Sequence, residues 1–326
     1  MKYCKLLLYI AIAIILTRVK IMVNLLSLDL ERLERKKYMC KIAIMTDSNC
    51  GILSEQGNKL GIHIVPMPII VDGKTYYEGI DIFTEEFYKK QAEGAEITSS
   101  LPSPGSVIDM WDELLETYDE VVYIPMSSGL SNSCGSAMTL ARDYEGKVYV
   151  VDNKRISVTL VQAVLDALKM AEQGMSGADI KTTLEKEAAD ANIYIAVDTL
   201  EYLKKGGRIT AAGAAIGSVL NIKPVLNLQE EKLDAFAKVR GMKAAFRTMC
   251  KALHKDLEGR FKELHENGEL LLGMAHTYME PEELAQWKKE FEEEFPGEEI
   301  LYGVLTLSIG CHLGPGALGI GLVRKK

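Results

Sequence analysis

The chain alternates short apolar runs with stretches of helical period, and this alternation constrains the fold more than any other feature. Three runs are apolar along most of their length and end in polar residues, at 41–48, 121–126 and 148–153. Amphipathic helices are predicted among them, at 103–117 and 156–174. Strands that are apolar on both faces are typical of a parallel sheet covered by helices. The first half of the chain is therefore predicted to form an α/β/α domain.

The second half mixes strands and helices in a less regular order. Strands are predicted at 192–198, 223–228, 232–239, 269–277 and 299–305, the second and third of them as a hairpin. Residues 199–220 are predicted to form a helix, a Gly-Gly turn and a second helix. The fold class is thus α/β with two domains: a parallel-sheet α/β/α domain at 39–175 and an α+β domain with a mixed sheet at 176–326.

Residues 1–38 differ from the rest and are treated as an N-terminal extension. Lys2 and Lys5 precede the apolar run Leu6–Leu16, which is shorter than the roughly 20 residues that span a bilayer. A charged start and an apolar centre are typical of a signal peptide, but no small-residue cleavage site follows. The segment is either a membrane-associated leader or the product of too early a start codon. We favour a start at Met39, because a strand begins directly after it.

Composition excludes several classes of function. The net charge of −8 disfavours a sequence-independent grip on nucleic acid and stable contact with an anionic membrane. The six cysteines form no C-x-x-C pair and the five histidines form no H-E-x-x-H pattern, so metal catalysis has little support. Scattered cysteines of this kind are typical of a cytoplasmic protein. The common nucleotide-binding loops are also missing.

Polar loops follow two of the apolar runs, at the strand ends where open parallel sheets bind ligands. One is Met45–Asn49 and the other is 127–133, with the sequence SSGLSNS. The hydroxyls of Ser127 and Ser128, with the amides that open the next helix, could hold a carboxylate or phosphate. The alternative is a turn whose serines only cap the helix. A nucleophilic serine has less support, because the G-x-S-x-G pattern is absent here.

Three further loops are candidates for the same site, each with a structural alternative. Ser99 and Ser100 lie in a polar loop that runs into a helix, where a turn and a cap would also explain them. His312 lies among four glycines and a proline at 310–319, which suits close approach of a ligand or a purely structural turn. Arg208 follows a Gly-Gly turn and suits recognition of a carboxylate or phosphate, unless it only completes a solvated helix end.

These segments, taken in order, resemble the DegV family of bacterial fatty-acid-binding proteins. The resemblance covers residues 39–323. Its motifs are TDS, VPMPIIVDGKTYYEGIDI, SSLPSPG, SSGLS, DTLEYLKKGGRI, LNIKPVL, KVRG and HLGPGALG. Each motif alone is weak, whereas the ordered set is specific.

The resemblance implies two domains with a long-chain fatty acid buried between them, and no cofactor. The implied carboxylate-binding residues are Ser99, Ser100, Ser127, Ser128 and His312. Characterised members are not enzymes but cytoplasmic carriers. They present the fatty acid to a separate ATP-dependent fatty acid kinase, which forms an acyl phosphate for phospholipid synthesis. Arg208 resembles the arginine that contacts this kinase.

The sequence departs from the family pattern at Leu101, Asn132 and Leu313, which replace glutamine, glycine and threonine. These changes bear on loop geometry and chain preference, while the hydroxyl and imidazole groups are kept. Two other functions stay open at this stage, a serine-type acyl hydrolase and a lipid-sensing regulatory protein. The lack of a clear third triad member counts against the hydrolase, and the sequence does not separate carrier from sensor.

Overall fold

The structure is a computed structural model that describes residues 40–210, 222–228 and 232–326. The extension predicted at 1–38 lies outside these residues, as does most of the second helix predicted within 199–220. Residues 41–326 form one structural unit, and the fold is described for this unit alone.

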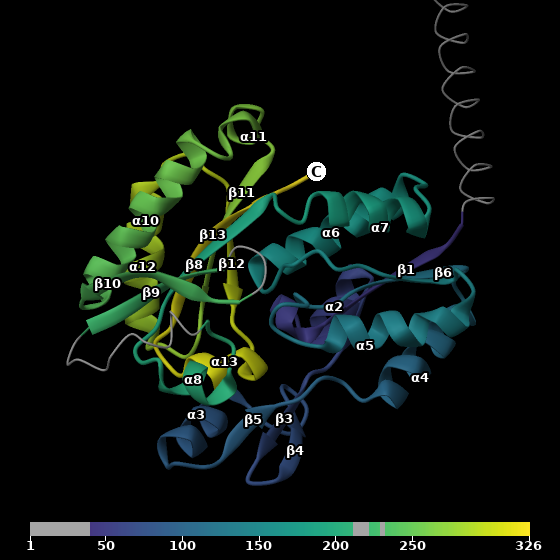
Figure 1. Ribbon diagram of the computed structural model, residues 1–326, viewed down its shortest axis with the longest axis horizontal. Coiled ribbons are helices and arrows are strands. Elements are labelled where there is room, and N and C mark those ends of the chain that lie inside the picture. Colours follow the sequence, from purple (N-terminus) through teal and green to yellow (C-terminus); the bar gives the residue numbers. More distant parts are fainter. Residues whose placement is uncertain (1–39, 211–221, 229–231) are drawn as a thin grey trace, which may run out of the picture. The chain divides into compact units, whose positions relative to one another are not determined.

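The first domain is built on a parallel sheet of four strands in the order β2–β1–β6–β7. Figure 1 shows its neighbouring strands β1 and β6. The strands are β1 (Ile42–Asp47), β2 (Ile62–Val65), β6 (Glu120–Ile124) and β7 (Val148–Val150). Four longer helices cover this sheet: α4 (Pro104–Leu115), α5 (Ser133–Leu140), α6 (Val158–Glu172) and α7 (Gly177–Lys186). Short helices complete the domain: η1 (Ser48–Cys50), α2 (Ser54–Leu60) and η2 (Ala141–Tyr144).

Both faces of the parallel sheet are buried, as the apolar runs predicted. Along β1, Ile42 and Ile44 pack with α6 and α7, while Ala43 and Met45 pack with α4. This alternation follows from the two-residue period of a strand. Trp111 of α4 is fully buried on the second face. The predicted three-layer α/β/α arrangement is therefore confirmed.

A small antiparallel sheet, in the order β4–β3–β5, extends the first half of the chain. Its strands are β3 (Pro68–Val71), β4 (Lys74–Tyr77) and β5 (Ile97–Ser99), and α3 (Thr84–Ala92) lies between β4 and β5 in sequence. The buried side chains Ile69, Phe87 and Tyr88 of this region pack against Leu307 and Cys311 near the C-terminus. This region of the first half of the chain therefore packs against α13, which is formed much later in the sequence.

The second domain contains a mixed sheet in the order β10–β9–β8–β13–β11–β12. Its strands are β8 (Ala191–Ala196), β9 (Ile222–Leu228), β10 (Asp234–Arg240), β11 (Leu270–His276), β12 (Ile300–Val304) and β13 (Leu318–Arg324). All neighbours are antiparallel except β11 and β12. Its helices are α8 (Glu201–Gly206), α10 (Met242–Glu258), α11 (Lys262–Glu266), α12 (Pro281–Glu294) and α13 (Leu307–Leu313). The predicted mixed sheet and hairpin are confirmed.

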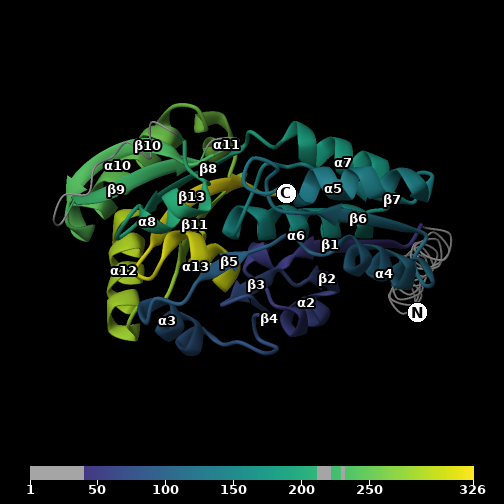
Figure 2. The same cartoon turned by 60° about the horizontal axis from the view of Figure 1, so that its bottom comes forward.

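The two faces of this mixed sheet have different neighbours. Side chains of α10 and α12 pack on one face, with Phe246, Trp287 and Phe291 at the centre of the contact. The other face is turned toward α6, which Figure 2 shows between the parallel and mixed sheets. Helix α6 therefore contributes to the cores of both domains.

Two details differ from the sequence prediction. No element was predicted for most of the last twenty residues, which form α13 and the central strand β13. In addition, α7 follows the predicted domain boundary at 175 but packs against β6 and β7 of the first sheet. The boundary between 175 and 176 stays a prediction, and one after Lys186 agrees better with this packing.

Candidate functional site

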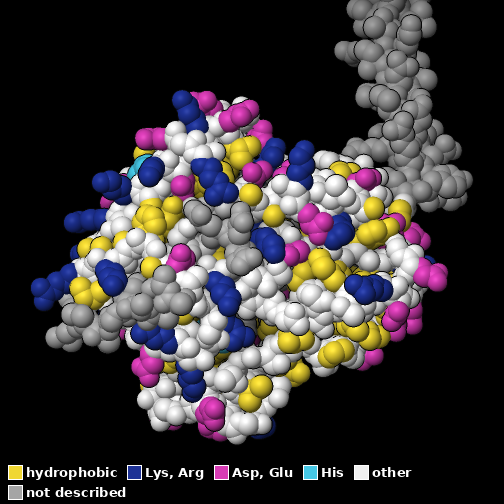
Figure 3. Space-filling view, in the orientation of Figure 1, with side chains coloured by type: hydrophobic (Ala, Val, Ile, Leu, Met, Phe, Trp, Pro, Cys, Tyr) yellow, Lys and Arg dark blue, Asp and Glu magenta, His cyan; other side chains and the backbone are white. Residues whose placement is uncertain are grey.

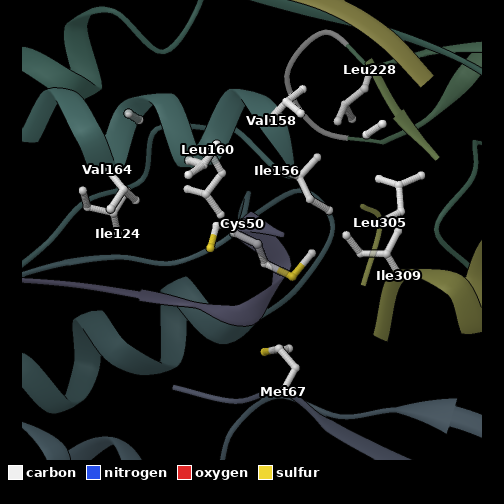
Figure 4. Packing of buried hydrophobic residues seen from close by; sticks show 14 of the residues in the cluster. Cys50, Met67, Ile124, Ile156, Val158, Leu160, Val164, Leu228, Leu305 and Ile309 are labelled. Atoms are coloured by element: carbon white, nitrogen blue, oxygen red, sulfur yellow. The ribbon is translucent and has the colours of Figure 1, made fainter. Parts of the chain in front are cut away.

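A cavity of about 310 Å³ is lined by residues of both domains. This volume lies at the lower end of the roughly 300–1,000 Å³ that is usual for small-molecule sites. The apolar part of its wall includes Met67, Met126, Ile156, Val158, Ile193, Ile195, Leu228, Leu305 and Ile309. In Figure 4, the side chains of Ile156 and Val158 lie across from those of Leu228, Leu305 and Ile309.

The cavity is possible because one strand at the centre of the mixed sheet carries glycines where it faces the cavity. On β8, Ile193 and Ile195 line the cavity, whereas Tyr194 between them packs on the α10 side. Their partners on β13 are Gly321 and Gly319. Because these two residues have no side chain, the centre of the sheet leaves room for a ligand beside α6.

Polar side chains gather at another part of the cavity wall, where Ser99 meets His312. Ser99 ends β5 and His312 lies near the end of α13, yet Ser99 Oγ and His312 Nε2 are 2.8 Å apart. Helix α13 is held at its start by Glu78, whose Oε2 accepts from the Leu307 amide at 2.8 Å. The small sheet thus fixes both members of the pair.

The imidazole of His312 is held between a glycine and an arginine. A Cβ atom on Gly206 would lie 2.3 Å from His312 Nδ1, so only glycine leaves space for this ring position. Burial, and then the positive charge of Arg208, lower the pKa of His312 to about 4. At neutral pH the ring is therefore uncharged. Arg208 itself donates to the Gly206 carbonyl and lines the cavity, which brings a permanent positive charge to this polar end.

The serine residues of the SSLPSPG loop divide into two roles. Ser99 and Ser100 both line the cavity. Ser103 accepts from the Ser106 amide at 3.0 Å and caps α4, which begins at Pro104 as the sequence predicted.

The SSGLSNS loop contributes to the cavity, but not through the residues that the resemblance named. Ser131 and Asn132 line the cavity, whereas Ser127 and Ser128 are not part of its wall. Ser127 Oγ accepts from the Gly129 amide at 3.2 Å, which closes a tight turn. Ser128 lies outside the wall because its Oγ accepts from Lys154 on the neighbouring loop.

The site also contains polar residues beyond the predicted carboxylate-binding set, of which Asn49 lies in the predicted loop Met45–Asn49 and the other two were not predicted. Asn49, Ser157 and Ser308 line the cavity. A signal existed for Asn49, which follows the TDS motif at the end of β1, and for Ser308, which lies four residues before His312 on the same side of α13. Nothing in the local pattern marks Ser157, which is placed by the turn between β7 and α6.

Asp47 of the TDS motif supports the cavity without lining it. Its carboxylate accepts from the amides of Asn49 and Met126, at 2.9 and 2.8 Å. The ends of β1 and β6 are thereby tied together, as expected for neighbouring strands of a parallel sheet. Burial raises the pKa of Asp47 to about 6.

The Ser99–His312 pair has the distance of a nucleophile and its base, but its surroundings do not favour catalysis. A base that works near neutral pH needs a pKa close to that pH, and a triad histidine is oriented by a carboxylate. The charged group beside His312 is instead Arg208, which lowers the pKa of the imidazole. The geometry therefore suits binding of an anion better than activation of serine.

Features typical of metal sites and of membrane-spanning helices are absent from the residues that the structure describes. Within 40–210, 222–228 and 232–326, no group of three Asp, Glu, His or Cys side chains is placed to bind a metal ion. Over the same ranges, no helix combines the length and the apolar character that crossing a bilayer requires. The described cysteines, Cys40, Cys50, Cys134, Cys250 and Cys311, are free thiols.

One face of the second domain is basic, although the whole chain is acidic. In Figure 3, Lys and Arg side chains gather over β10 and α10 and again near α8. Lys238 and Arg240 of β10 are exposed, as are Lys204 and Lys205 of α8, which precede Arg208 in sequence. A partner with an acidic surface would be attracted to this face.

An apolar cavity with one polar, cationic end is typical of a binding protein for a small amphipathic molecule. Comparison with known families agrees with this class. A family model described as "Uncharacterised protein, DegV family" matches residues 41–325. The chain belongs to the DegV family, which confirms the resemblance that the motifs predicted.

Curated relatives match most of the chain. The chain is 33% identical over 291 residues to a DegV domain-containing protein of Listeria innocua, covering 86% of this chain and 97% of the relative. It is 32% identical over 289 residues to protein DegV of Bacillus subtilis, covering 86% and 98%. The matches therefore extend over nearly the whole length of both relatives and over most of this chain.

Solved structures of the family share the fold. A fatty-acid-binding DegV family protein of Thermus thermophilus has a TM-score of 0.77 at 32% identity, covering 87% of this chain and 99% of the other. DegV of Bacillus subtilis, a fatty acid binding protein, has a TM-score of 0.75 at 30% identity, covering 88% and 100%. A stearic acid-binding protein of Eubacterium ventriosum has a TM-score of 0.77 at 26% identity, covering 88% and 99%.

Proposed function

We propose that this protein binds one long-chain fatty acid in the cavity between its domains, with the acyl chain against the apolar wall. The observation that carries the proposal is the cavity itself, which is apolar over most of its wall and polar where Ser99 meets His312. The fatty acids bound by its structural relatives support the same class of ligand.

The carboxylate is proposed to bind Ser99, Ser100 and His312, with Arg208 supplying the positive charge. Hydroxyl and imidazole donors bind a carboxylate without requiring a second buried cation. A bound carboxylate also favours protonation of His312, so binding is coupled to proton uptake. Ser127 and Ser128 are proposed to act indirectly, by holding the turn that brings Ser131 to the cavity.

Burial of the acyl chain supplies most of the binding energy. At about 0.8 kcal/mol for each buried CH₂, a sixteen-carbon chain contributes on the order of 10 kcal/mol before the costs of association. The polar end then sets the direction in which the chain enters and contributes less to the total.

We further propose that the protein is a cytoplasmic carrier without catalytic activity or cofactor, which presents its ligand to a separate ATP-dependent fatty acid kinase. Arg208 is the proposed contact, because it lies both at the cavity and next to the exposed Lys204 and Lys205. Acyl phosphate is then the product of the kinase, for use in phospholipid synthesis.

The first test is to purify residues 39–326, denature the protein and analyse the extracted lipids by mass spectrometry. One long-chain fatty acid per protein is expected, and the Ser99→Ala/His312→Ala double variant is expected to lose most of it. His254→Ala is the matched control, because His254 lies on α10 and pairs with Glu294 away from the cavity. An empty extract, together with no uptake of added fatty acid, would contradict the proposal.

The carrier role needs a second test. Loaded protein and ATP are expected to give no acyl phosphate until a fatty acid kinase from the same organism is added. Arg208→Glu is expected to lower the rate of this reaction by at least tenfold, more than any change in fatty acid content. Acyl phosphate formation, or ester hydrolysis, by the pure protein alone would refute the carrier role.

A further inference from the structure

Four glycines lie on the face of the mixed sheet that is turned toward α6 and the cavity. They are Gly273 of β11, Gly303 of β12, and Gly319 and Gly321 of β13. The residues that alternate with them along these strands pack on the opposite face, against α10 and α12. Gly319 and Gly321 line the cavity directly. A side chain added at Gly319 would therefore project toward the cavity.

Three of these glycines are required by the packing of the protein itself. A Cβ atom on Gly273 would lie 2.6 Å from Val158 Cγ2, and one on Gly303 would lie 2.8 Å from Val158 Cγ1. A Cβ atom on Gly321 would lie 2.4 Å from the carbonyl oxygen of Asn192. Contacts this short would force Val158 or strand β8 to shift, so each of these positions needs glycine for a structural reason.

Gly319 differs, because the fold leaves room for a larger residue there. The nearest atoms to an added Cβ are the carbonyl oxygens of Ala275 and Tyr194, both at 3.7 Å, which is ordinary van der Waals contact. The backbone at Gly319 is not in the left-handed region that favours glycine. Within a strand, glycine is less stable than alanine. The packing of the described residues therefore gives no reason for glycine at this position, and the space beside it belongs to the cavity.

The register of the sheet places Gly319 toward the polar end of the cavity. Gly319 pairs with Ile195 near the end of β8, two residues closer to α8 than the partner of Gly321. Helix α8 ends at Gly206, beside the ring of His312. The two glycines of β13 are about 7 Å apart along the strand. An acyl chain whose carboxylate lies at His312 is therefore expected to pass Gly319 before Gly321.

The opposite walls of the cavity leave less room at the sides of the chain. In Figure 4, Ile156 and Val158 lie across from Leu228, Leu305 and Ile309. All five side chains are branched and buried. A ligand that needs extra width can therefore gain it most easily on the side of β13, where the side chain is missing.

We propose that Gly319 is a specificity-determining residue, whose missing side chain gives a bent acyl chain the width that it needs beside β13. The proposal rests on the fatty acid function proposed above and adds which shape of chain the cavity admits. A straight chain is narrow and passes an alanine at this position with little change. A cis double bond bends the chain to one side, and a methyl group on residue 319 would occupy the space that this bend takes.

The test measures, by calorimetry on the full chain, the affinities for oleic and cis-vaccenic acid and for their trans isomers, elaidic and trans-vaccenic acid. Within each pair the composition is identical and only the bend differs. Gly319→Ala is expected to lower the cis-to-trans affinity ratio about tenfold for at least one pair, the effect of one methylene-sized mismatch in an apolar pocket. The control is Gly105→Ala on α4, at an exposed glycine where an added Cβ meets only Ser103 Oγ at 3.9 Å, and it is expected to keep the parent ratios.

Ala275→Gly provides a second variant in case Gly319→Ala does not fold. Ala275 is the cross-strand partner of Gly319 and also lines the cavity, so loss of its methyl group is expected to raise the cis-to-trans ratio. The proposal is overturned if folded Gly319→Ala weakens the cis and trans acids alike or weakens neither. Where Gly319→Ala does not fold, parent ratios in Ala275→Gly overturn it. Failure of all four acids to bind the parent would instead overturn the fatty acid function itself.

Discussion

Alanine substitutions at two adjacent glycines, Gly206 and Gly207, can distinguish the effect of the His312 position on fatty acid binding from effects on folding stability. At Gly206, an added Cβ would lie 2.3 Å from His312 Nδ1 and 3.1 Å from Cε1. At Gly207, the same atom would meet nothing within 4 Å, but φ is +68°, which disfavours alanine. Gly206→Ala therefore displaces the imidazole, whereas Gly207→Ala strains the backbone and leaves the imidazole in place.

The expected magnitudes follow from these distances. Relief of the clash at Gly206 moves the ring by on the order of 1 Å, which breaks a hydrogen bond such as the one to Ser99. Loss of the proposed hydrogen bond between His312 and the fatty acid carboxylate is expected to cost about 1–2 kcal/mol of binding free energy, so the affinity for a fatty acid should fall about 5- to 30-fold. Gly207→Ala costs roughly 1–2 kcal/mol of folding free energy through its left-handed conformation and changes affinity less than twofold.

The assay measures palmitic acid affinity by calorimetry and folding free energy by urea denaturation for the parent and both variants. Gly206→Ala is expected to lose affinity out of proportion to its loss of stability, and Gly207→Ala the reverse. If folded Gly206→Ala binds palmitic acid as tightly as the parent, His312 does not hold the carboxylate and the reasoning fails.

Three further predictions concern the cavity wall and the buried titratable groups. Val158 fills the space beside Gly273, so Val158→Ala should shift the extracted fatty acids to longer chains and lower the free energy of unfolding by about 1–2 kcal/mol. Gly273→Ala should shift the extracted fatty acids to shorter chains. Lipid mass spectra that are unchanged in both variants would contradict this prediction. Because the folded pKa of His312 is depressed from 6.5 to about 4, stability should fall as pH decreases through this window, and urea titrations of His312→Asn should show a flatter curve there. Burial raises the pKa of Glu78 from 4.5 to about 7, so the contribution of Glu78 to folding stability should be lost as the pH rises through that window. Urea titrations of Glu78→Gln should lack this loss of stability. A pH profile identical to that of the parent would contradict the prediction.

The parts of the fold that follow local rules could be predicted from the sequence. The parallel strands were visible because they are apolar on both faces, and Ser103 with Pro104 marked the start of α4. Helix α13 and strand β13 were missed because glycines interrupt both, and the apolar period is hidden. Their structure depends on pairing with β8 and β11, which a local pattern does not encode.

The site could be predicted in its chemistry but only partly in its membership. One cavity is lined by the predicted residues Ser99, Ser100, Arg208 and His312. Ser99 and His312 lie 213 positions apart in the sequence. Which serines of a serine-rich turn face the cavity depends on the loop conformation, here set by Lys154 and Asp152 of a neighbouring loop. Such contacts between loops are not visible in the order of residues.

The position of β13 has a consequence for the synthesis of the protein. This strand follows every other strand of the mixed sheet in sequence, yet it lies between β8 and β11 at the centre of that sheet. Until β13 has left the ribosome, β8 and β11 lack the strand that joins them, and the cavity lacks Gly319 and Gly321. The first domain can fold as it emerges, whereas the mixed sheet can be completed only after β13 has emerged. A chain truncated before β13 is therefore expected not to close the cavity, even when its first domain is complete.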